Sequence, residues 1–411
     1  MIVGALVGAA VILLGLGLEI YFRMQAPFGS ISDPSRFAPE VGFIYTPGAE
    51  VRSTNNFDYW TVQRANKWGF LDREPTQMPL TPDECRVAFI GDSFVEAVQV
   101  PIEQKVQVVI ERLATKHAPQ LKLSASAFGY SGTGQLNQLP FYDKFARLLK
   151  PRIVILVFVS NDFHNNSKVL EALRNGWDPD HAPRIFASQD DAGVMAIQPI
   201  DPRWDEKTLK SPLRQQTTRA LWHGRFKQHS AFYRWFYGKI ALLHPQLADF
   251  IAGTSGINMT VYHAPQLQSR APYRWILEDW DVARDTDIDE ILSRGQIPRV
   301  FKQAVDYTGF ALDQFLKRAR QDRFNLVILA TSELSDAKYG NGQLERLMKL
   351  ADLRNIPVVD QRRYITSVGG DPKQARFAHD GHWSPQGHRW AAEAILELLK
   401  RRPELCRGVS Q

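Results

Sequence analysis

A serine, a histidine and an aspartate stand in contexts from which they could cleave an ester together. Ser93 lies in Gly91-Asp92-Ser93-Phe94, directly after the apolar run 87–90. Glycine lets the backbone turn sharply at such a point, so the hydroxyl can be presented as a nucleophile. A hydroxyl reacts poorly at neutral pH until a base takes its proton. His382 is the candidate base, and Asp380 would orient the imidazole and stabilise its charged form.

Two further blocks follow in order: Gly132 within Gly129-Tyr130-Ser131-Gly132-Thr133-Gly134, and Asn161 within Ser160-Asn161-Asp162. Together with Ser93 and His382, this series resembles the SGNH hydrolases, also called the GDSL esterase and lipase superfamily, which is named after these four residue types. The resemblance covers residues 84–165 and 300–402. It implies an oxyanion hole made by the backbone N–H groups of Ser93 and Gly132 and the side-chain amide of Asn161.

The chain departs from the family pattern in two places. Ser160 stands where the family usually has a glycine before the Asn-Asp pair. A single residue separates Asp380 from His382, where the family usually has two, and this shorter spacing also occurs in relatives that acetylate alginate. Each assignment also has a competitor in the sequence. The alternatives are Gly129 or Gly134 in place of Gly132, a turn-capping role for Asn161, and His379 or His388 in place of His382.

Alternating strand-like and helix-like segments surround these blocks. Apolar runs predict buried strands, and amphipathic stretches predict helices. The predicted strands are 86–90, 121–127, 153–159, 326–330 and 356–360, and the predicted helices are 103–116, 136–149, 300–320, 344–353 and 385–400. This alternation indicates an α/β fold with a flavodoxin-like, doubly wound parallel sheet, as the SGNH resemblance also implies. The blocks would then meet at the carboxyl edge of the sheet.

The N-terminus predicts a membrane anchor over residues 1–22. Residues 2–18 are uncharged and mostly aliphatic, and residues 20–22 extend the run past Glu19. About 20 apolar residues suffice to cross a bilayer as a helix. A cleaved signal peptide is the alternative, although residues 22–27 supply its cleavage pattern poorly and no Lys or Arg precedes the run. We expect the catalytic domain on the periplasmic or extracytoplasmic side.

Two segments lie outside the resemblance. Residues 23–83 contain strand-like pieces at 43–48 and 59–64, followed by the stretch 66–72, so we predict a strand-containing stem that docks on the catalytic domain. Residues 166–299 are too long for a structureless connection, and we predict a helical insertion or cap. The catalytic domain itself would comprise residues 84–165 and 300–405.

One part of the insertion is basic and aromatic. Residues 211–248 hold six basic residues and no acidic ones; the basic residues are Arg214, Arg219, Arg225, Lys227, Arg234 and Lys239. Aromatic residues are interleaved among them. Such helices could dock on a membrane surface, line a groove for an acidic polysaccharide, or cover the domain with a solvated basic face and a buried aromatic face. The formal charge of the whole chain is only +6, and no motif supports nucleic acid binding.

The chain has two cysteines, and their positions suggest a disulfide bond. Cys85 precedes the first predicted strand and Cys406 follows the last predicted helix. In a doubly wound sheet both points lie at the edge opposite the active site, and the first and last helices share one face. We therefore predict a Cys85–Cys406 bridge if the domain is exported. Two free thiols are the alternative.

These patterns predict a serine esterase acting on short-chain acyl esters such as acetyl esters, with an envelope polysaccharide as one candidate carrier. The expected partners are a small acyl ester or acylated carbohydrate, and the membrane through the N-terminal helix. No cofactor or metal is expected, since no His, Asp or Glu cluster has ligand spacing. An O-acyltransferase using the same residues is the first alternative. A non-catalytic binding or assembly protein on this fold is the second.

Overall fold

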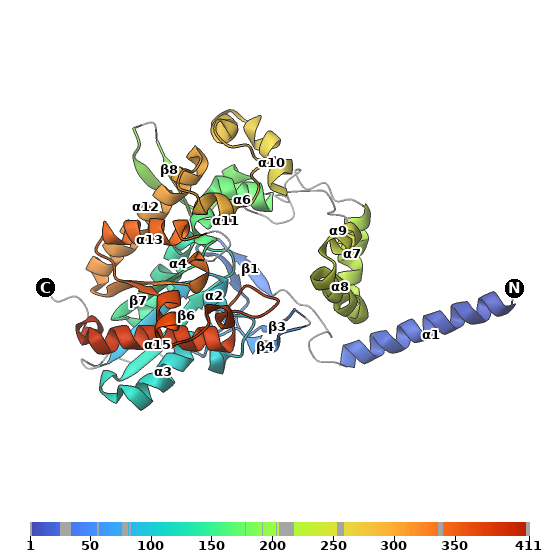
Figure 1. Ribbon diagram of the computed structural model, residues 1–411, viewed down its shortest axis with the longest axis horizontal. Helices are drawn as coiled ribbons and strands as arrows, with labels where there is room; N and C mark the ends of the chain where they lie inside the picture. Colours follow the sequence, from blue (N-terminus) through green and yellow to red (C-terminus); the bar gives the residue numbers. More distant parts are fainter. Residues whose placement is uncertain are drawn as a thin grey trace.

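A parallel sheet of five strands forms the centre of the molecule (Figure 1). The computed structural model describes residues 2–24, 34–55, 57–75, 81, 84–176, 178–190, 192–202, 204, 218–252, 259–335 and 340–407. The strands are β5 (Cys85–Gly91), β6 (Leu123–Gly129), β7 (Ile153–Phe158), β10 (Asn325–Ala330) and β11 (Val358–Asp360). Their spatial order is β6-β5-β7-β10-β11, which is 2-1-3-4-5 when the strands are numbered along the chain. This is the flavodoxin-like order, so the predicted α/β parallel sheet is confirmed.

Helices cover both faces of this sheet. All six residues of β7 are buried, and because successive side chains of a strand point to opposite faces, they divide between two cores. Residues 153, 155 and 157 pack with α3 (Val106–His117) and α15 (Pro385–Arg401). Residues 154, 156 and 158 pack with α4 (Gln135–Lys144) and α12 (Arg299–Asp322). The shorter helices of this part are α2 (Ser93–Glu96), α5 (Asp162–Asn165), α13 (Gly342–Asp352) and α14 (Gln361–Ser367).

The predicted helix 136–149 is wrong in its second half. α4 ends at Lys144, and a short 3-10 helix covers Ala146–Leu149. The chain changes direction at Phe145, whose ring packs against those of Trp68 and Phe70, with ring centres 5.9 and 5.2 Å apart. This aromatic contact with a distant segment is invisible in a local sequence pattern.

The predicted disulfide is confirmed. Cys85 and Cys406 are bonded, with their Cα atoms 4.8 Å apart. Cys85 begins β5, so the bridge lies at the amino edge of the sheet, opposite the edge at which the strands end. α3 and α15 pack on the same face, as the prediction required.

Two antiparallel hairpins make up the first part of the stem, which we define as residues 34–75. They are β1 (Ser35–Ala38) with β2 (Gly42–Tyr45), and β3 (Glu50–Thr54) with β4 (Trp60–Arg64). The strand-like pieces predicted at 43–48 and 59–64 therefore correspond to β2 and β4. The boundaries predicted for the anchor, stem, catalytic domain and insertion stay predictions.

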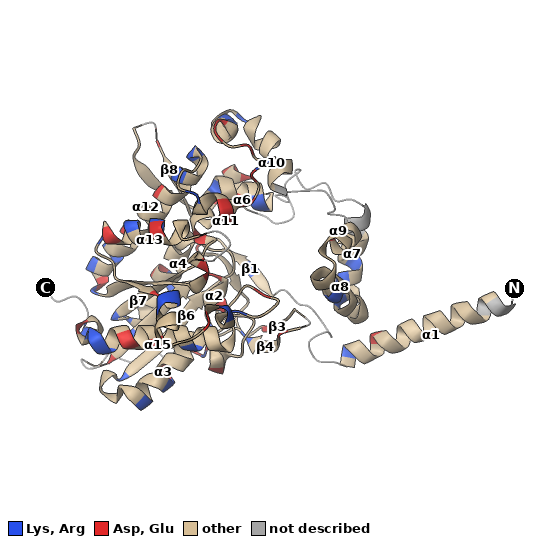
Figure 2. Ribbon diagram, viewed as in Figure 1, with Lys and Arg blue, Asp and Glu red and all other residues tan. Residues whose placement is uncertain are grey.

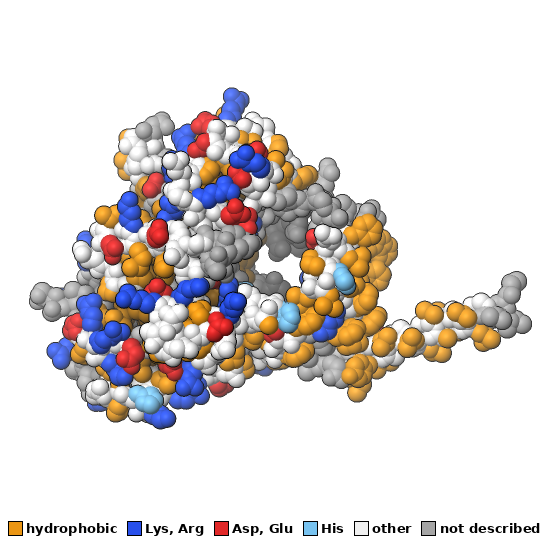
Figure 3. All heavy atoms as spheres, in the orientation of Figure 1, with side chains coloured by type: hydrophobic (Ala, Val, Ile, Leu, Met, Phe, Trp, Pro, Cys, Tyr) orange, Lys and Arg blue, Asp and Glu red, His pale blue; other side chains and the backbone are white. Residues whose placement is uncertain are grey.

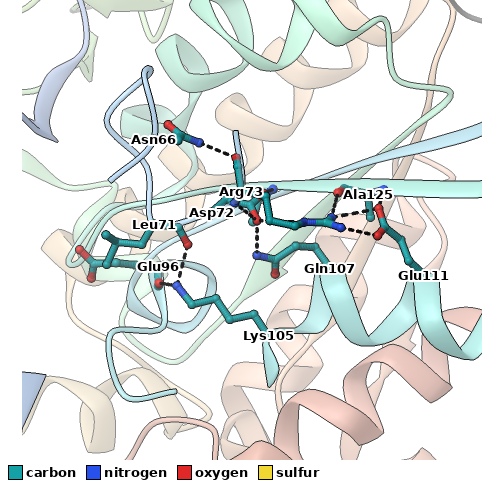
Figure 4. A network of polar contacts seen from close by, with 10 residues as sticks. Asn66, Leu71, Asp72, Arg73, Glu96, Lys105, Gln107, Glu111 and Ala125 are labelled. Carbon is teal, nitrogen blue, oxygen red and sulfur yellow. Dashed lines mark hydrogen bonds and ion pairs between the residues drawn. The ribbon is translucent and has the colours of Figure 1, made fainter. Parts of the chain in front are cut away.

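The end of the stem joins the sheet domain through a buried polar network (Figure 4). The Asp72 carboxylate accepts a hydrogen bond from the side chain of Gln107 at 3.0 Å, and burial raises its pKa. The Lys105 ammonium donates to the carbonyl oxygens of Leu71 and Glu96 at 2.7 and 2.6 Å. Burial lowers the pKa of Lys105 to about 7. Buried polar groups are costly to leave unpaired, so this network fixes the stem on the domain.

The insertion is mostly helical, with one antiparallel hairpin among its described residues. Its elements are α6 (Lys168–Asn175), β8 (Phe186–Gln189), β9 (Met195–Gln198), α7 (Thr218–His229), α8 (Ala231–Leu243), α9 (Pro245–Ala252), α10 (Met259–Gln268) and α11 (Ile288–Ser293). α7, α8 and α9 form a group beside the end of α1 (Ile2–Met24), which extends away from the rest of the molecule in Figure 1. Among the described residues, one helix, Leu6–Met24, is long and apolar enough to cross a membrane.

Candidate active site

Ser93, His382 and Asp380 form a chain of hydrogen bonds at the carboxyl edge of the sheet. Ser93 begins α2 immediately after β5. The Nε2 atom of His382 lies 2.8 Å from Ser93 Oγ, and its Nδ1 atom lies 2.5 Å from Asp380 Oδ1. The same carboxylate oxygen also accepts the backbone N–H of His382 at 2.9 Å. This turn bond from side chain to backbone two residues on lets the shortened Asp-x-His spacing present both groups correctly.

The charges around His382 favour its protonated form. Burial alone would lower the pKa of His382, but the hydrogen bond and charge of Asp380, with the carboxylates of Asp92 and Glu333, outweigh burial and raise it above the ordinary 6.5. Burial would raise the pKa of Asp380, yet its hydrogen bonds from His382 hold it below the usual range. An imidazole with a raised pKa takes up a proton from a hydroxyl more readily, which suits a general base.

A tyrosine of the stem contacts the far oxygen of Asp380. The Tyr59 hydroxyl donates to Asp380 Oδ2 at 3.2 Å, and the Tyr59 ring packs against Phe377 with ring centres 5.3 Å apart. Burial and the Asp380 charge raise the pKa of Tyr59, so this hydroxyl stays a donor. The sequence patterns did not reveal this contact.

The two competing histidines are held elsewhere. His379 donates its backbone N–H to Asp58 Oδ2 at 2.9 Å, and its ring nitrogen lies 3.0 Å from Asp58 Oδ1. His388 is buried, and its Nδ1 atom accepts the backbone N–H of Val106 at 3.3 Å. Burial and the charge of Lys105 lower the pKa of His388 to about 3. Of the three candidates, His382 is the one that hydrogen-bonds the Ser93 hydroxyl.

The glycine and asparagine blocks lie beside the serine block. β5 pairs in register with β6 on one side and β7 on the other, so the turns after these three strands are neighbours. Gly132 has a φ of 66°, the left-handed region that favours glycine. An added Cβ would meet its nearest atom, in Arg184, only at 3.6 Å. Backbone conformation therefore accounts for a glycine at position 132.

Gly129 has a different reason to be a glycine. A Cβ at Gly129 would lie 2.3 Å from the backbone nitrogen of Glu96, so only a glycine fits beside the helix that carries Ser93. The loop itself is held from two sides: the Arg184 guanidinium donates to the carbonyl oxygen of Gly132, and the Ser131 hydroxyl donates to the Glu96 carboxylate. The oxyanion role of Gly132 and Asn161 stays a prediction.

Two buried carboxyl groups lie behind the serine. Asp92 accepts the backbone N–H of Phe94 at 3.0 Å and hydrogen-bonds the side chain of Asn161, and its Oδ2 atom lies 3.2 Å from Ser93 Oγ. Burial raises its pKa. Asp162 accepts the backbone N–H of Val159 at 2.9 Å, and burial together with the Asp92 charge raises its pKa well above the usual value. The nearby Asp92 charge therefore disfavours ionisation of Asp162. The carboxylate that hydrogen-bonds His382 is that of Asp380.

Glu333 also reaches this edge of the sheet. It belongs to a 3-10 helix, Ser332–Ser335, just after β10, and its carboxylate accepts the backbone N–H of Ser160 at 2.9 Å. Burial, opposed by this hydrogen bond, raises its pKa to about 7. The sequence could have indicated the position of Glu333 at this edge, because Glu333 follows an apolar strand just as Ser93 does.

No family model and no curated protein matches the chain. Among solved structures it is similar to an acetyl xylan esterase, at 11% identity over 76% of this chain and 99% of that one, with a TM-score of 0.35. It is also similar to an acetylxylan esterase from Geobacillus stearothermophilus, at 10% identity over 76% of this chain and 92% of that one, with a TM-score of 0.35. A member of the lipolytic protein G-D-S-L family from Veillonella parvula is similar at 12% identity over 77% of this chain and 98% of that one, with a TM-score of 0.34. TM-scores this low do not indicate the activity of this chain, which must be inferred from the geometry of the site.

Proposed function

We propose that this protein is a serine esterase of the SGNH kind that acts on short-chain acyl esters. The observation that carries the proposal is the hydrogen-bond chain from Ser93 through His382 to Asp380. In this chain a hydroxyl, a base and a carboxylate follow one another within hydrogen-bonding distance, which is the arrangement needed to activate a serine.

The reaction would proceed in two halves. Ser93 Oγ attacks the ester carbonyl carbon as its proton moves to His382 Nε2, and the carbonyl oxygen takes up the negative charge. The backbone N–H groups of Ser93 and Gly132 and the amide of Asn161 stabilise that oxyanion. His382 then gives the proton to the departing alcohol, which leaves an acyl group on Ser93. A water molecule, deprotonated by His382, releases the acid and restores the Ser93 hydroxyl.

A small acyl group fits the position of the nucleophile best. Ser93 is only 8% exposed, so an acetyl group would approach its hydroxyl with less obstruction than a long chain. The His382 side chain is 30% exposed, which leaves room on that side for the alcohol. An acylated carbohydrate is the substrate class that we propose.

We also propose that α1 anchors the protein and that the rest of the chain lies outside the cytoplasm. The helix has the length and apolar composition of a membrane span. The Cys85–Cys406 bond supports the location, because disulfides persist in oxidising compartments and are rare in the cytosol.

The test is hydrolysis of 4-nitrophenyl acetate by the full chain in detergent. Ser93→Ala and His382→Ala should each lose activity by a factor on the order of 10⁴ or more, with unchanged circular dichroism. His379→Ala is the matched control, since it removes the neighbouring histidine and should retain most of the activity. Turnover that survives in Ser93→Ala would refute the nucleophile. A folded wild type that transfers acetyl to a sugar hydroxyl, but not to water, would identify the transferase alternative.

A further inference from the structure

Helices α7–α9 expose large apolar side chains to the surface. Their exposed fractions lie between 44% and 64%. These side chains are Trp222, Phe226, Phe236, Leu243 and Leu247. The covering-helix alternative, with a buried aromatic face, therefore does not hold for the rings of Trp222, Phe226 and Phe236. Arg214 lies outside the described residues. A contiguous apolar surface of this kind marks a site of interaction.

The end of α1 is locked onto the start of α8. Glu19 accepts the Ser230 hydroxyl at 2.7 Å and the backbone N–H groups of Ala231 and Phe232 at 3.0 and 3.1 Å. Arg23 pairs with Glu19 at 2.6 Å. A carboxylate suits a helix N-terminus, where backbone N–H groups lack partners. A charge near a membrane span is costly unless it is paired, and these contacts pair the acidic residue of α1.

Aromatic rings complete this junction. Phe22 of α1 stacks against Trp235, with ring centres 4.7 Å apart, and lies 5.8 Å from the ring of Phe232. Tryptophan and tyrosine concentrate at the headgroup level of membranes, and Tyr21 lies next to this cluster in the sequence. The junction therefore has the composition of a membrane interface and places α8 at that level.

The exposed apolar surface faces the side to which α1 extends. In Figure 3 the hydrophobic side chains of the α7–α9 group look toward that side, and the sheet domain lies on the other side of the group. A bilayer crossed by α1 would therefore meet this surface. Residues 218–252 also carry five Lys and Arg against one Asp, and Figure 2 shows basic positions along α7 and α8. Long basic side chains reach headgroups while their stems stay among apolar groups.

We propose that α7–α9 form a platform that lies in the headgroup region of the same membrane that α1 crosses. The apolar side chains insert at the boundary of the acyl chains, and the exposed Arg225 and Lys227 side chains bind the phosphates of anionic lipids. The inference rests on the proposed anchor role of α1. Lys239 of α8 lies 3.5 Å from the ring centre of Phe57 in the stem, so the platform would also hold the stem and the active site at a fixed height above the bilayer.

The test measures the depth of nitroxide labels on the full chain in vesicles of phosphatidylethanolamine and phosphatidylglycerol. Labels are placed on Leu243→Cys and Leu247→Cys, two positions of the platform, one on α8 and one on α9. Leu353→Cys is the matched control, because this exposed leucine lies on the sheet domain. Oxygen, which concentrates among acyl chains, should accelerate the spin relaxation of the platform labels. A water-soluble nickel chelate should accelerate the spin relaxation of the control label.

Equal nickel access at positions 243, 247 and 353 would overturn the platform and leave this surface to a protein or polysaccharide partner. A fourth label, on Leu13→Cys, separates this result from a failure of the anchor. Oxygen access at Leu13 with nickel access at the platform refutes the platform alone, whereas nickel access at Leu13 refutes the anchor and the platform together. In vesicles of phosphatidylcholine alone, the platform labels should move toward water, since the anionic phosphates are gone.

Discussion

The stem and the platform both lie outside the parallel sheet, but they meet it in opposite ways. The stem is joined to the sheet domain by hydrogen bonds, several of which end on residues near Ser93 and Asp380, the proposed nucleophile and its carboxylate. The platform exposes its apolar side chains and makes its described polar contacts mainly with α1. The buried polar contacts of the stem therefore connect it to the candidate active site, whereas the exposed apolar side chains of the platform suit the proposed contact with a membrane.

Gln63 illustrates the stem side of this comparison. Its buried amide donates to the carbonyl oxygens of Ala97, Val98 and Val100, at 3.1, 3.1 and 3.0 Å. These residues follow α2, so the amide fixes the loop that leaves the nucleophile. Next to it, the Thr61 hydroxyl also donates to the Val98 carbonyl, at 2.5 Å. Within the stem, Gln63 and Thr61 therefore hold the loop that follows Ser93, whereas Tyr59 hydrogen-bonds Asp380.

The largest effect on activity should come from a substitution in the candidate active site itself, and the effects of substitutions in the stem and the platform are compared with it. Asp380→Asn should lower kcat/KM by about 10³–10⁴-fold, because the imidazole loses its charged partner. In the wild type, activity needs neutral His382 and should rise with pH through a value above 6.5. The variant removes the main influence that raises this pKa, so the acidic limb should move to lower pH. A pH–rate profile of both proteins checks this, and an unmoved limb would contradict the pairing.

Gln63→Leu should have the next largest effect and would sharpen the comparison. It removes the amide that donates to the carbonyl oxygens of Ala97, Val98 and Val100, which should cost about 1–3 kcal/mol of unfolding free energy. Val98 keeps the Thr61 hydroxyl as a donor. Displacement of the loop after Ser93 should lower kcat/KM by about 10–100-fold. Urea denaturation and steady-state kinetics measure the two effects.

Val62→Ala is the control for Gln63→Leu. Val62 lies on the same strand with its side chain 52% exposed, and it should change stability by no more than about 0.5 kcal/mol. Equal effects of the two substitutions would show that the stem acts only as a generic support.

Tyr59→Phe should have a smaller effect. The substitution removes the hydroxyl that donates to Asp380 Oδ2. It should lower kcat/KM by about 3–10-fold, as expected for the loss of one hydrogen bond to a charged group. Because Asp380 then shares its charge with fewer donors, it attracts a proton to His382 more strongly, and the acidic limb should move to higher pH. A fall in kcat/KM without any movement of the limb would mean that Tyr59 only packs against the loop.

The smallest effect should come from the platform. Lys239→Met removes the cation from the Phe57 ring, a contact worth about 0.5–2 kcal/mol that does not touch the triad. Hydrolysis of a water-soluble aryl acetate should change by less than about threefold, since this contact only positions α8 beside the stem. A loss of activity as large as that of Gln63→Leu would contradict the distinction between the stem and the platform, and would indicate that α8 contributes to the active site.

The sequence predicted the parts of this molecule that depend on local patterns. β5 and β7 are largely apolar runs, and the polar residues after them mark the carboxyl edge, so Ser93 and Asn161 could be placed beside one another in advance. Glu333 obeys the same rule and could have been found. The disulfide followed from the topology of the sheet.

The remaining contacts could not be predicted, because they join segments far apart in the chain. Tyr59 and Asp380 are 321 residues apart, and nothing around either residue indicates the other. The basic, aromatic helices left three interpretations open, since a pattern of side chains on a helix does not say which face is covered. Exposure of Trp222 and Phe226 in the folded chain excludes the buried aromatic face there.

The Cys85–Cys406 bond makes a covalent ring of nearly the whole molecule outside the anchor, stem and C-terminal tail. A protease that cuts this ring once, at any loop of the insertion, leaves two pieces still joined through sulfur. Ser93 and His382 would then belong to different polypeptides of one molecule, and both would remain attached to the N-terminal helix. The bond therefore protects the assembly of the site against a single proteolytic cleavage.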